Sequence, residues 1–172
     1  MFPILGIISY LCRKMSTMSK FLFYMKVKPF IRQWLTYHFG NPVVFPAKSA
    51  ENACIRHFVG LRPKNAKPIK PEPDDNMIAI VIPESKRKKT ICWNYMSQSA
   101  CDALNEVVDD TFRLQLWTDL NAMTQCHCSI LTSVRAWCEN NGISTDYDYT
   151  LKMRYQRMRN SYLKYGIDLR KK

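Results

Sequence analysis

The segment from Ser97 to Asn121 restricts the fold of this chain more than any other part of the sequence, because it predicts one long helix. Ser97 or Ser99 can cap its first turn, since a serine hydroxyl accepts a hydrogen bond from a free backbone N–H there. A helix that is apolar around much of its circumference is more often the core of a domain than a surface element. Nine apolar side chains follow that pattern here: Ala103, Leu104, Val107, Val108, Phe112, Leu114, Leu116, Trp117 and Leu120.

Shorter elements precede this helix. Pro29 suits the first turn of a helix that Gly40-Asn41-Pro42 ends, and Ser49 can cap a second helix that stops near Gly60. Residues 43–45 predict a short strand. Residues 77–82 and 90–95 read as two strands joined by Pro83 and the six residues 84–89, and so short a connection favours an antiparallel hairpin. The sequence therefore predicts a mainly α protein with a small antiparallel β-hairpin (α+β), completed by a helix-turn-helix-like pair at the carboxyl end.

We divide the 172 residues into four segments, which suffice for one ordinary domain or a small domain plus an arm. Residues 1–24 form an apolar and basic extension, 25–61 an amino-terminal helical segment, 62–76 a proline-rich linker or loop, and 77–172 the hairpin with the remaining helices. The apolar run of the extension is shorter than the roughly 20 residues of a spanning helix, and its positive charge follows the run. We expect this extension to be dispensable, with an interfacial anchor and packing onto the domain as the open alternatives.

Charge is distributed in blocks. The chain has 26 Lys and Arg against 14 Asp and Glu, a net charge of +12. Residues 1–71 carry +11, residues 72–89 are balanced, residues 90–150 carry −6, and residues 151–172 carry +7. Segregated charge of this kind is typical of an electrostatic footprint for an anionic partner, although a solvated basic face gives the same pattern.

The strongest functional signal lies in residues 129–166. A first helix runs from about Ser129 to Asn140 and ends at Gly142, which suits a left-handed cap. A second helix runs from about Tyr147 to Tyr165, with one apolar stripe and a polar, basic remainder. The residues of that remainder are Lys152, Gln156, Arg157, Arg159, Asn160 and Lys164.

This pair resembles helix-turn-helix DNA-binding units, through Gly142-Ile143-Ser144 in the turn and the small Cys138 four residues before the glycine. The resemblance implies that the second helix enters the major groove. One position departs from it, because Asp148 stands where an apolar residue is usual. Leu151 could serve instead if the turn is longer by about three residues. The Lys28-Pro29-Phe30-Ile31 opening, the Asn41-Pro42 turn and the stretch 155–159 also resemble small uncharacterised basic proteins of bacterial temperate phages and mobile elements.

Enzymatic chemistry and metal binding find little support. No Walker loop, H-E-x-x-H or G-x-S-x-G motif occurs, and we expect the acids Asp102, Glu106, Asp109 and Asp110 to line a solvent-exposed helix face. Cys126-His127-Cys128 lacks the second ligand pair that zinc sites need. We expect the seven cysteines to be free thiols in a reducing, cytoplasmic bacterial compartment. The sequence thus predicts no enzyme, no metal and no cofactor.

The leading hypothesis is a DNA-binding protein of a phage or mobile element, regulatory or DNA-recruiting, that contacts DNA through helix 147–165. Four further bases at the expected hairpin tip could meet phosphates or serve only as a solubilising turn: Lys86, Arg87, Lys88 and Lys89. An interaction or assembly module without DNA contact is the alternative, with the acidic segment pairing with a basic segment of a second copy. An enzyme of unrecognised chemistry is the weakest alternative, and a membrane partner is not expected.

Overall fold

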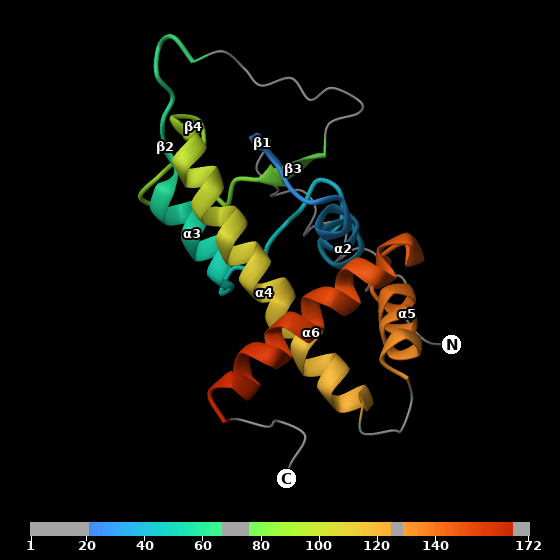
Figure 1. The fold of residues 1–172 in the computed structure, drawn as a ribbon. Coiled ribbons are helices and arrows are strands. Elements are labelled where there is room, and N and C mark those ends of the chain that lie inside the picture. Colours follow the sequence, from blue (N-terminus) through green and yellow to red (C-terminus); the bar gives the residue numbers. More distant parts are fainter. Residues whose placement is uncertain (1–20, 67–75, 125–128, 167–172) are drawn as a thin grey trace, which may run out of the picture.

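The long helix predicted from the sequence is the centre of the molecule. A computed structural model describes residues 21–66, 76–124 and 129–166, and in it helix α4 spans Gln98–Thr124 (Figure 1). One stripe of α4, repeating every four residues, is fully buried: Leu104, Val108, Phe112, Leu116 and Leu120. The apolar residues outside this stripe are less covered, and Leu114 is 67% exposed. The core role is confirmed, although α4 buries one stripe and not most of its circumference.

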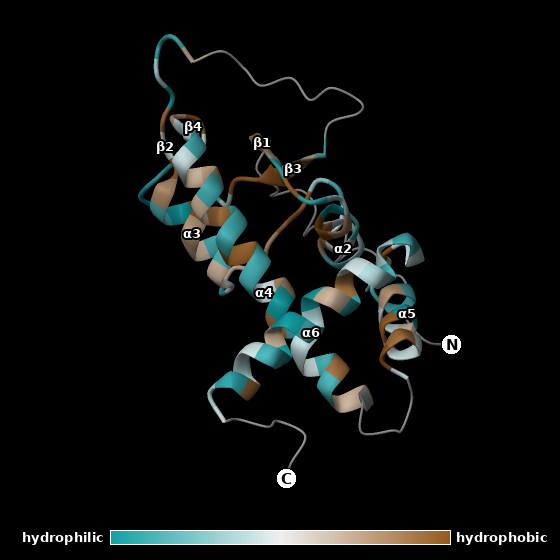
Figure 2. Ribbon diagram, viewed as in Figure 1, coloured by the Kyte–Doolittle hydropathy of each residue, from teal (hydrophilic) through white to brown (hydrophobic). Residues whose placement is uncertain are grey.

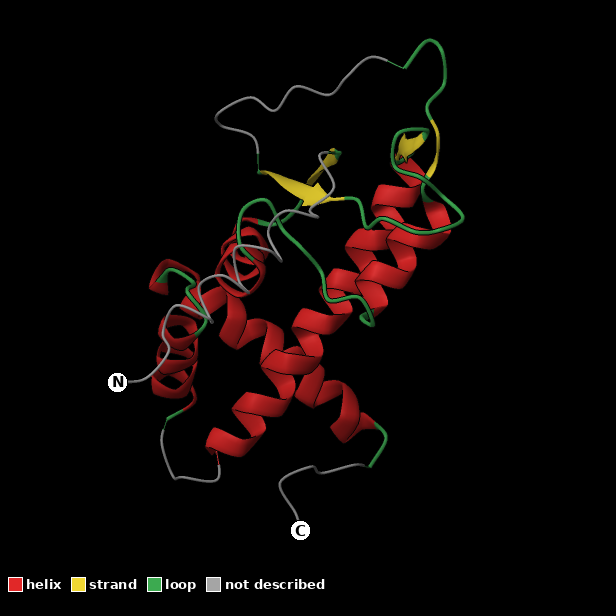
Figure 3. Ribbon diagram, turned by 180° about the vertical axis from the view of Figure 1, so that it is seen from behind, coloured by secondary structure: helices red, strands yellow, loops and turns green. Residues whose placement is uncertain are grey.

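Two shorter helices begin and end at the expected residues. α2 spans Pro29–Phe39 with proline in its first turn, and Gly40 ends it with a φ of +82°. α3 spans Ala50–Phe58, and the Ser49 hydroxyl accepts the Asn52 N–H at 3.1 Å as its cap. α3 packs along the first half of α4, as both ribbon views show (Figures 1 and 3). Local capping signals therefore located both helices correctly.

The small antiparallel β content is confirmed, but the predicted hairpin between residues 77–82 and 90–95 is wrong. Strand β3, Met77–Val81, pairs with β1, Leu22–Lys26, and strand β4, Trp93–Tyr95, pairs with the two-residue β2, Gly60–Leu61. These are two separate two-stranded sheets. The basic segment between β3 and β4 is therefore a connection between sheets and not a hairpin tip.

The physical reason is that neither edge of β3 is left for β4. β1 covers one edge along five residue pairs, from Leu22 opposite Val81 to Lys26 opposite Met77. The other edge meets Val43, whose N–H donates to Ala79 O at 2.8 Å and whose O accepts from Val81 N–H at 2.9 Å. The strand expected over residues 43–45 is thus a single parallel bridge. Figure 2 shows β3 in hydrophobic colours, consistent with a strand held between neighbours.

The segments 25–61 and 77–172 share one hydrophobic core. Phe30, Ile31 and Ile55 of the first segment pack in the same cluster as Leu104 and Leu151 of the second. The boundary between residues 24 and 25 falls inside β1, because Tyr24 and Met25 pair with consecutive residues of β3. Residues 1–20 and 67–75 lie outside the described part, and with them most of the extension and of the proline-rich segment. No helix in the described ranges is long and apolar enough to cross a membrane.

The carboxyl-terminal helix pair forms close to its predicted positions. α5 spans Ile130–Asn140, a short 3-10 helix η1 covers Thr145–Tyr147, and α6 spans Asp148–Lys164. Gly142 adopts a φ of +66°, and the next residue, Ile143, donates its N–H to Cys138 O at 2.9 Å and is buried. η1 lengthens the turn by one helical turn, so Leu151 and not Asp148 is the first buried residue of α6.

Gly142→Ala is expected to destabilise the fold more than Gly166→Ala. Both glycines have a positive φ, which costs an L-residue about 1 kcal/mol. A Cβ at Gly142 would also lie 2.4 Å from Tyr37 Cδ2, whereas a Cβ at Gly166 meets nothing within 4 Å. We expect a loss of about 2–3 kcal/mol for the first variant and about 1 kcal/mol or less for the second. Urea denaturation measures both, and equal losses would contradict a role for the contact with Tyr37.

Candidate nucleic-acid interface

One side of α6 is fixed to the core by apolar and aromatic contacts. Leu151 and Tyr155 are buried, and the Tyr155 hydroxyl donates to Asn121 Oδ1 at 2.8 Å. Trp117 of α4 lies between the rings of Tyr155 and Tyr162, with ring centroids 5.3 Å away in both cases. Because these contacts recur every three or four residues, α6 lies across α4 in one rotational setting, and its opposite side faces away from the protein (Figures 1 and 3).

An ion pair at the edge of the core also restrains α6. Arg154 pairs with Asp109 of α4, and its guanidinium lies 5.9 Å from the ring centroid of Phe30 and 5.6 Å from that of Phe112. Lys28 also contacts Asp109, at 3.1 Å. Burial alone would raise the pKa of the Asp109 carboxyl, but Lys28 and Arg154 outweigh it and hold that pKa below its ordinary value of 3.8. Asp109 therefore belongs to the packing of three elements and not to a solvent-exposed acidic face.

The turn before α6 is held by a polar network. Buried Asn141 accepts Gln115 Nε2–H at 3.1 Å on Oδ1, which also lies 2.9 Å from His38 Nε2, while its own amide donates to Trp137 O at 2.8 Å. Gln33 of α2 accepts the Ser144 N–H at 2.8 Å. Helices α2 and α4 thus set the direction in which α6 leaves the turn.

Asp148, the residue that departs from the helix-turn-helix pattern, has a defined partner. It accepts Arg135 Nε–H of α5 at 2.7 Å. That hydrogen bond is the main reason why the pKa of Asp148 lies below its usual range. As the first residue of α6 it also places a negative charge at the positive end of the helix dipole, which stabilises the helix start. An acid is therefore compatible with this longer turn.

The structure brings together the six residues predicted on the second helix, all of them on α6, but they differ in exposure. Arg157, Asn160 and Lys164 are exposed. Lys152, Gln156 and Arg159 are half-buried, and Arg159 Nε is covered without a hydrogen-bond partner among the described residues. Figure 2 shows α6 largely in hydrophilic and neutral colours. The accessible bases lie toward the carboxyl-terminal half of the helix, whereas Asp146 and Asp148 lie at its start.

The four bases of the predicted hairpin tip lie elsewhere. The segment that carries them precedes β4 and the first turn of α4, whereas α6 contacts α4 between Asp109 and Asn121. At 1.5 Å per residue, the two regions lie several helical turns apart along α4. Lys86, Arg87 and Lys89 are exposed. They do not form one continuous site with α6 (Figure 1).

Lys88 has a structural role that its sequence context did not reveal. Its ammonium donates to three carbonyls at the end of α3, Arg56 O at 2.8 Å, His57 O at 3.1 Å and Val59 O at 3.1 Å. It also lies 5.0 Å from the centroid of the Trp93 ring. A lysine that satisfies the last carbonyls of a helix is a C-cap, so Lys88 is not available to phosphates.

Sequence reasoning also missed Arg154 and Asn141, whose partners are 26 to 103 residues away in the chain. It also did not predict that three large apolar side chains are exposed: Phe58 is 46%, Leu61 59% and Ile91 74% exposed.

The four cysteines that the structure describes differ in burial. Burial is the main cause that raises the pKa of Cys101 and of Cys138 to about 11, so both thiols are protonated and unreactive at neutral pH. Cys54 is half-buried and Cys92 exposed, and all four are free. Cys126-His127-Cys128 lies outside the described residues. In the part of the chain that the structure describes, no three His, Cys, Asp or Glu side chains are grouped as metal ligands would be.

No protein-family model, no curated protein and no solved structure matches this chain.

Lys88→Met is expected to lower the free energy of unfolding by about 1–2 kcal/mol, because three helix-end carbonyls lose a charged donor. Lys89→Met, at the exposed neighbouring position, is the matched control and should change it by less than about 0.5 kcal/mol. Urea denaturation compares the two. Equal effects would mean that the cap contributes nothing beyond an ordinary surface charge.

Asp109→Asn is expected to lower the free energy of unfolding by about 2 kcal/mol at pH 7, because Arg154, which lies against two aromatic rings, loses its charged partner. The pKa of Asp109 is lower in the folded than in the unfolded protein, so this stabilisation is present above the unfolded value and is lost as pH falls through the folded one. The difference between wild type and variant should therefore shrink below about pH 4. Asp110→Asn, whose side chain is 75% exposed, is the control and should have little effect at any pH.

Proposed function

We propose that this protein binds duplex DNA through the outward side of α6. The observation that carries the proposal is the combination of Arg157, Asn160 and Lys164, all exposed on one helix, with a core-facing side that is fixed by Tyr155 and by the Arg154–Asp109 pair. A helix fits the major groove, where an amide side chain can read base edges and cations neutralise phosphates. A rigid support reduces the entropy lost on binding.

Charge decides which part of α6 approaches DNA. Asp146 and Asp148 lie at its amino-terminal end, and Arg157 and Lys164 lie in the later half. The two carboxylates repel phosphates and the two bases attract them, so the later half of α6 contacts the DNA backbone. Half-buried Gln156 and exposed Asn160, four residues apart on one side of the helix, are then the residues placed to contact base edges. The role that we propose is regulatory or DNA-recruiting, since these are ordinary tasks of a helix-turn-helix-like module.

A salt titration tests this proposal. We expect the affinity of the full chain for a mixed-sequence duplex to fall steeply with salt, and Arg157→Gln and Lys164→Gln each to reduce the log–log slope by about one. Fluorescence anisotropy with a labelled duplex measures the slope.

The double variant Lys86→Gln and Arg87→Gln is the matched control, because it removes two exposed bases outside α6 and should leave the slope unchanged. Asn160→Ala should weaken binding to preferred sequences and leave the slope intact, since it removes no charge. Affinity indifferent to salt, or a slope that only the control variant changes, would refute binding through α6.

A further inference from the structure

The outer edge of β1 offers backbone hydrogen-bonding groups to an open cleft. Phe21 O accepts Ile82 N–H at 3.1 Å, and Val27 N–H donates to Asn76 O at 2.9 Å. In an antiparallel pair, hydrogen-bonded positions alternate with positions whose N–H and C=O groups point away from the partner. Leu22, Tyr24 and Lys26 therefore direct their backbone groups away from β3. The side-chain amide of Asn105 reaches Lys26 O at 3.5 Å from that outer side, which agrees with this assignment.

The described residues leave only this edge of the sheet open. Val43 occupies the far edge of β3, and no strand in the described ranges pairs with the outer edge of β1. An edge strand with free donors and acceptors is a template for pairing with another chain unless it is covered or interrupted. β1 contains no proline, and of its three outward-directed residues only Lys26, at the end of the strand, is charged.

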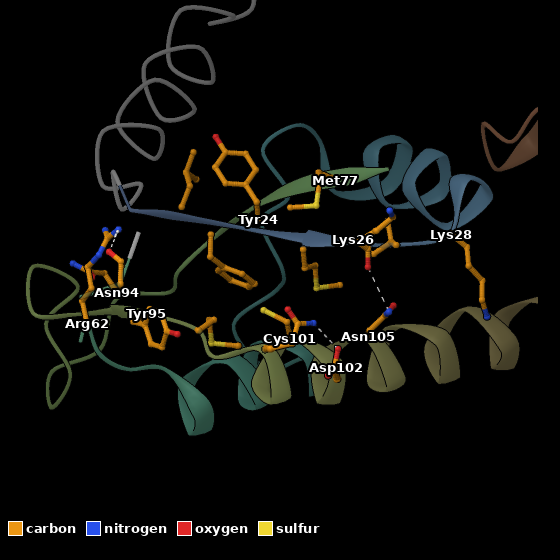
Figure 4. Close-up of a pocket in the computed structure, with 17 residues that line it drawn as sticks. Tyr24, Lys26, Lys28, Arg62, Met77, Asn94, Tyr95, Cys101, Asp102 and Asn105 are labelled. Atoms are coloured by element: carbon orange, nitrogen blue, oxygen red, sulfur yellow. Dashed lines mark hydrogen bonds between the residues drawn. The ribbon is translucent and has the colours of Figure 1, made fainter. Parts of the chain in front are cut away.

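A cleft of about 840 Å³ runs along this edge. Every residue from 22 to 28 lines it, whereas one face of a strand would contribute only alternate residues, so the backbone edge itself forms a wall. Figure 4 shows β1 along one side and the first turns of α4, with Cys101, Asp102 and Asn105, along the other. Asn94, Tyr95 and Arg62 lie at one end.

The charges around the cleft favour an acidic occupant. Its walls carry the cations Lys26, Lys28 and Arg62 against one carboxylate, Asp102. Lys28 also contacts Asp109, at 3.1 Å.

We propose that the cleft binds an extended, acidic peptide segment of a partner protein, which adds to β1 as a third strand through the backbone groups of Leu22 and Tyr24. Main-chain hydrogen bonds supply affinity in such strand addition, and side-chain surroundings supply selectivity. This site lies away from the outward side of α6, and it does not depend on DNA binding.

The test uses the full chain and a fluorescein-labelled hexapeptide of alternating glutamate and valine, followed by fluorescence anisotropy. Tyr24→Pro removes the outward N–H of residue 24 and no bond of the β1–β3 ladder, and an edge strand tolerates proline at such a position. Tyr24→Val is the matched control, since it removes the same side chain and keeps the N–H. We expect Tyr24→Pro to bind the peptide about tenfold more weakly than Tyr24→Val. A lysine–valine peptide should also bind about tenfold more weakly to the wild type.

Backbone methylation of the peptide gives a second measurement that does not depend on the stability of a variant. Methylating one alternate set of peptide amides should abolish binding to the wild-type chain, and methylating the other set should not, because only one set faces β1. Three outcomes would overturn the proposal. The peptide could fail to bind, the two methylated sets could bind equally, or the amides of Leu22 and Tyr24 could be protected from hydrogen exchange in the free protein. The last result would show that the chain itself covers this edge.

Discussion

The guanidinium of Arg154 holds the arrangement of the helices together. It contacts Asp109 of α4 while it lies against the rings of Phe30 and Phe112, and Asp109 in turn contacts Lys28 before α2. A cation that lies against two aromatic rings needs an anionic partner, because its charge is only partly hydrated there. Three elements must therefore meet at one point, and the rotational setting of α6 follows from it. Which polar residues of α6 face outward is a consequence of this meeting.

The helices could be predicted from the sequence because their signals are local. Ser49 and Ser129 accept backbone N–H groups at the helix starts, and Gly142 supplies the positive φ that ends α5, all within a few residues of the feature they specify. Strand pairing is not local. The apolar sequence of β3 does not specify which strand pairs with it. β1 lies more than fifty residues earlier in the chain, and its first residues belong to the segment 1–24 that the sequence indicated to be an extension. Proximity in sequence favoured β4, but the edges of β3 were occupied by β1 and Val43.

The candidate interface likewise contains residues that local sequence signals predicted and residues whose roles depend on distant partners. The helical period predicted that Arg157, Asn160 and Lys164 share a helix with an apolar stripe, and the structure places all three on its exposed surface. Lys88 could not be distinguished from Lys86 or Lys89 in the sequence, because its partners are carbonyls about thirty residues earlier. Arg154 likewise looked like one more base of a +7 segment. Whether a charged side chain on or near a helix has a structural role can be recognised only when its distant partner is known.

The anchoring of the turn before α6 on α2 has a consequence for how the chain acquires its structure. His38 meets Asn141 and Gln33 meets Ser144, across 103 and 111 residues of chain. During synthesis from the amino terminus, α2 is made long before the turn that its polar side chains contact. The side chains of Gln33 and His38 therefore stay in water until α5 and α6 have left the ribosome. The core closes when the turn between α5 and α6 packs against α2. The carboxyl-terminal helix pair is therefore the final piece of one cooperative unit, and a fragment holding that pair alone would lack the surface that aims its second helix.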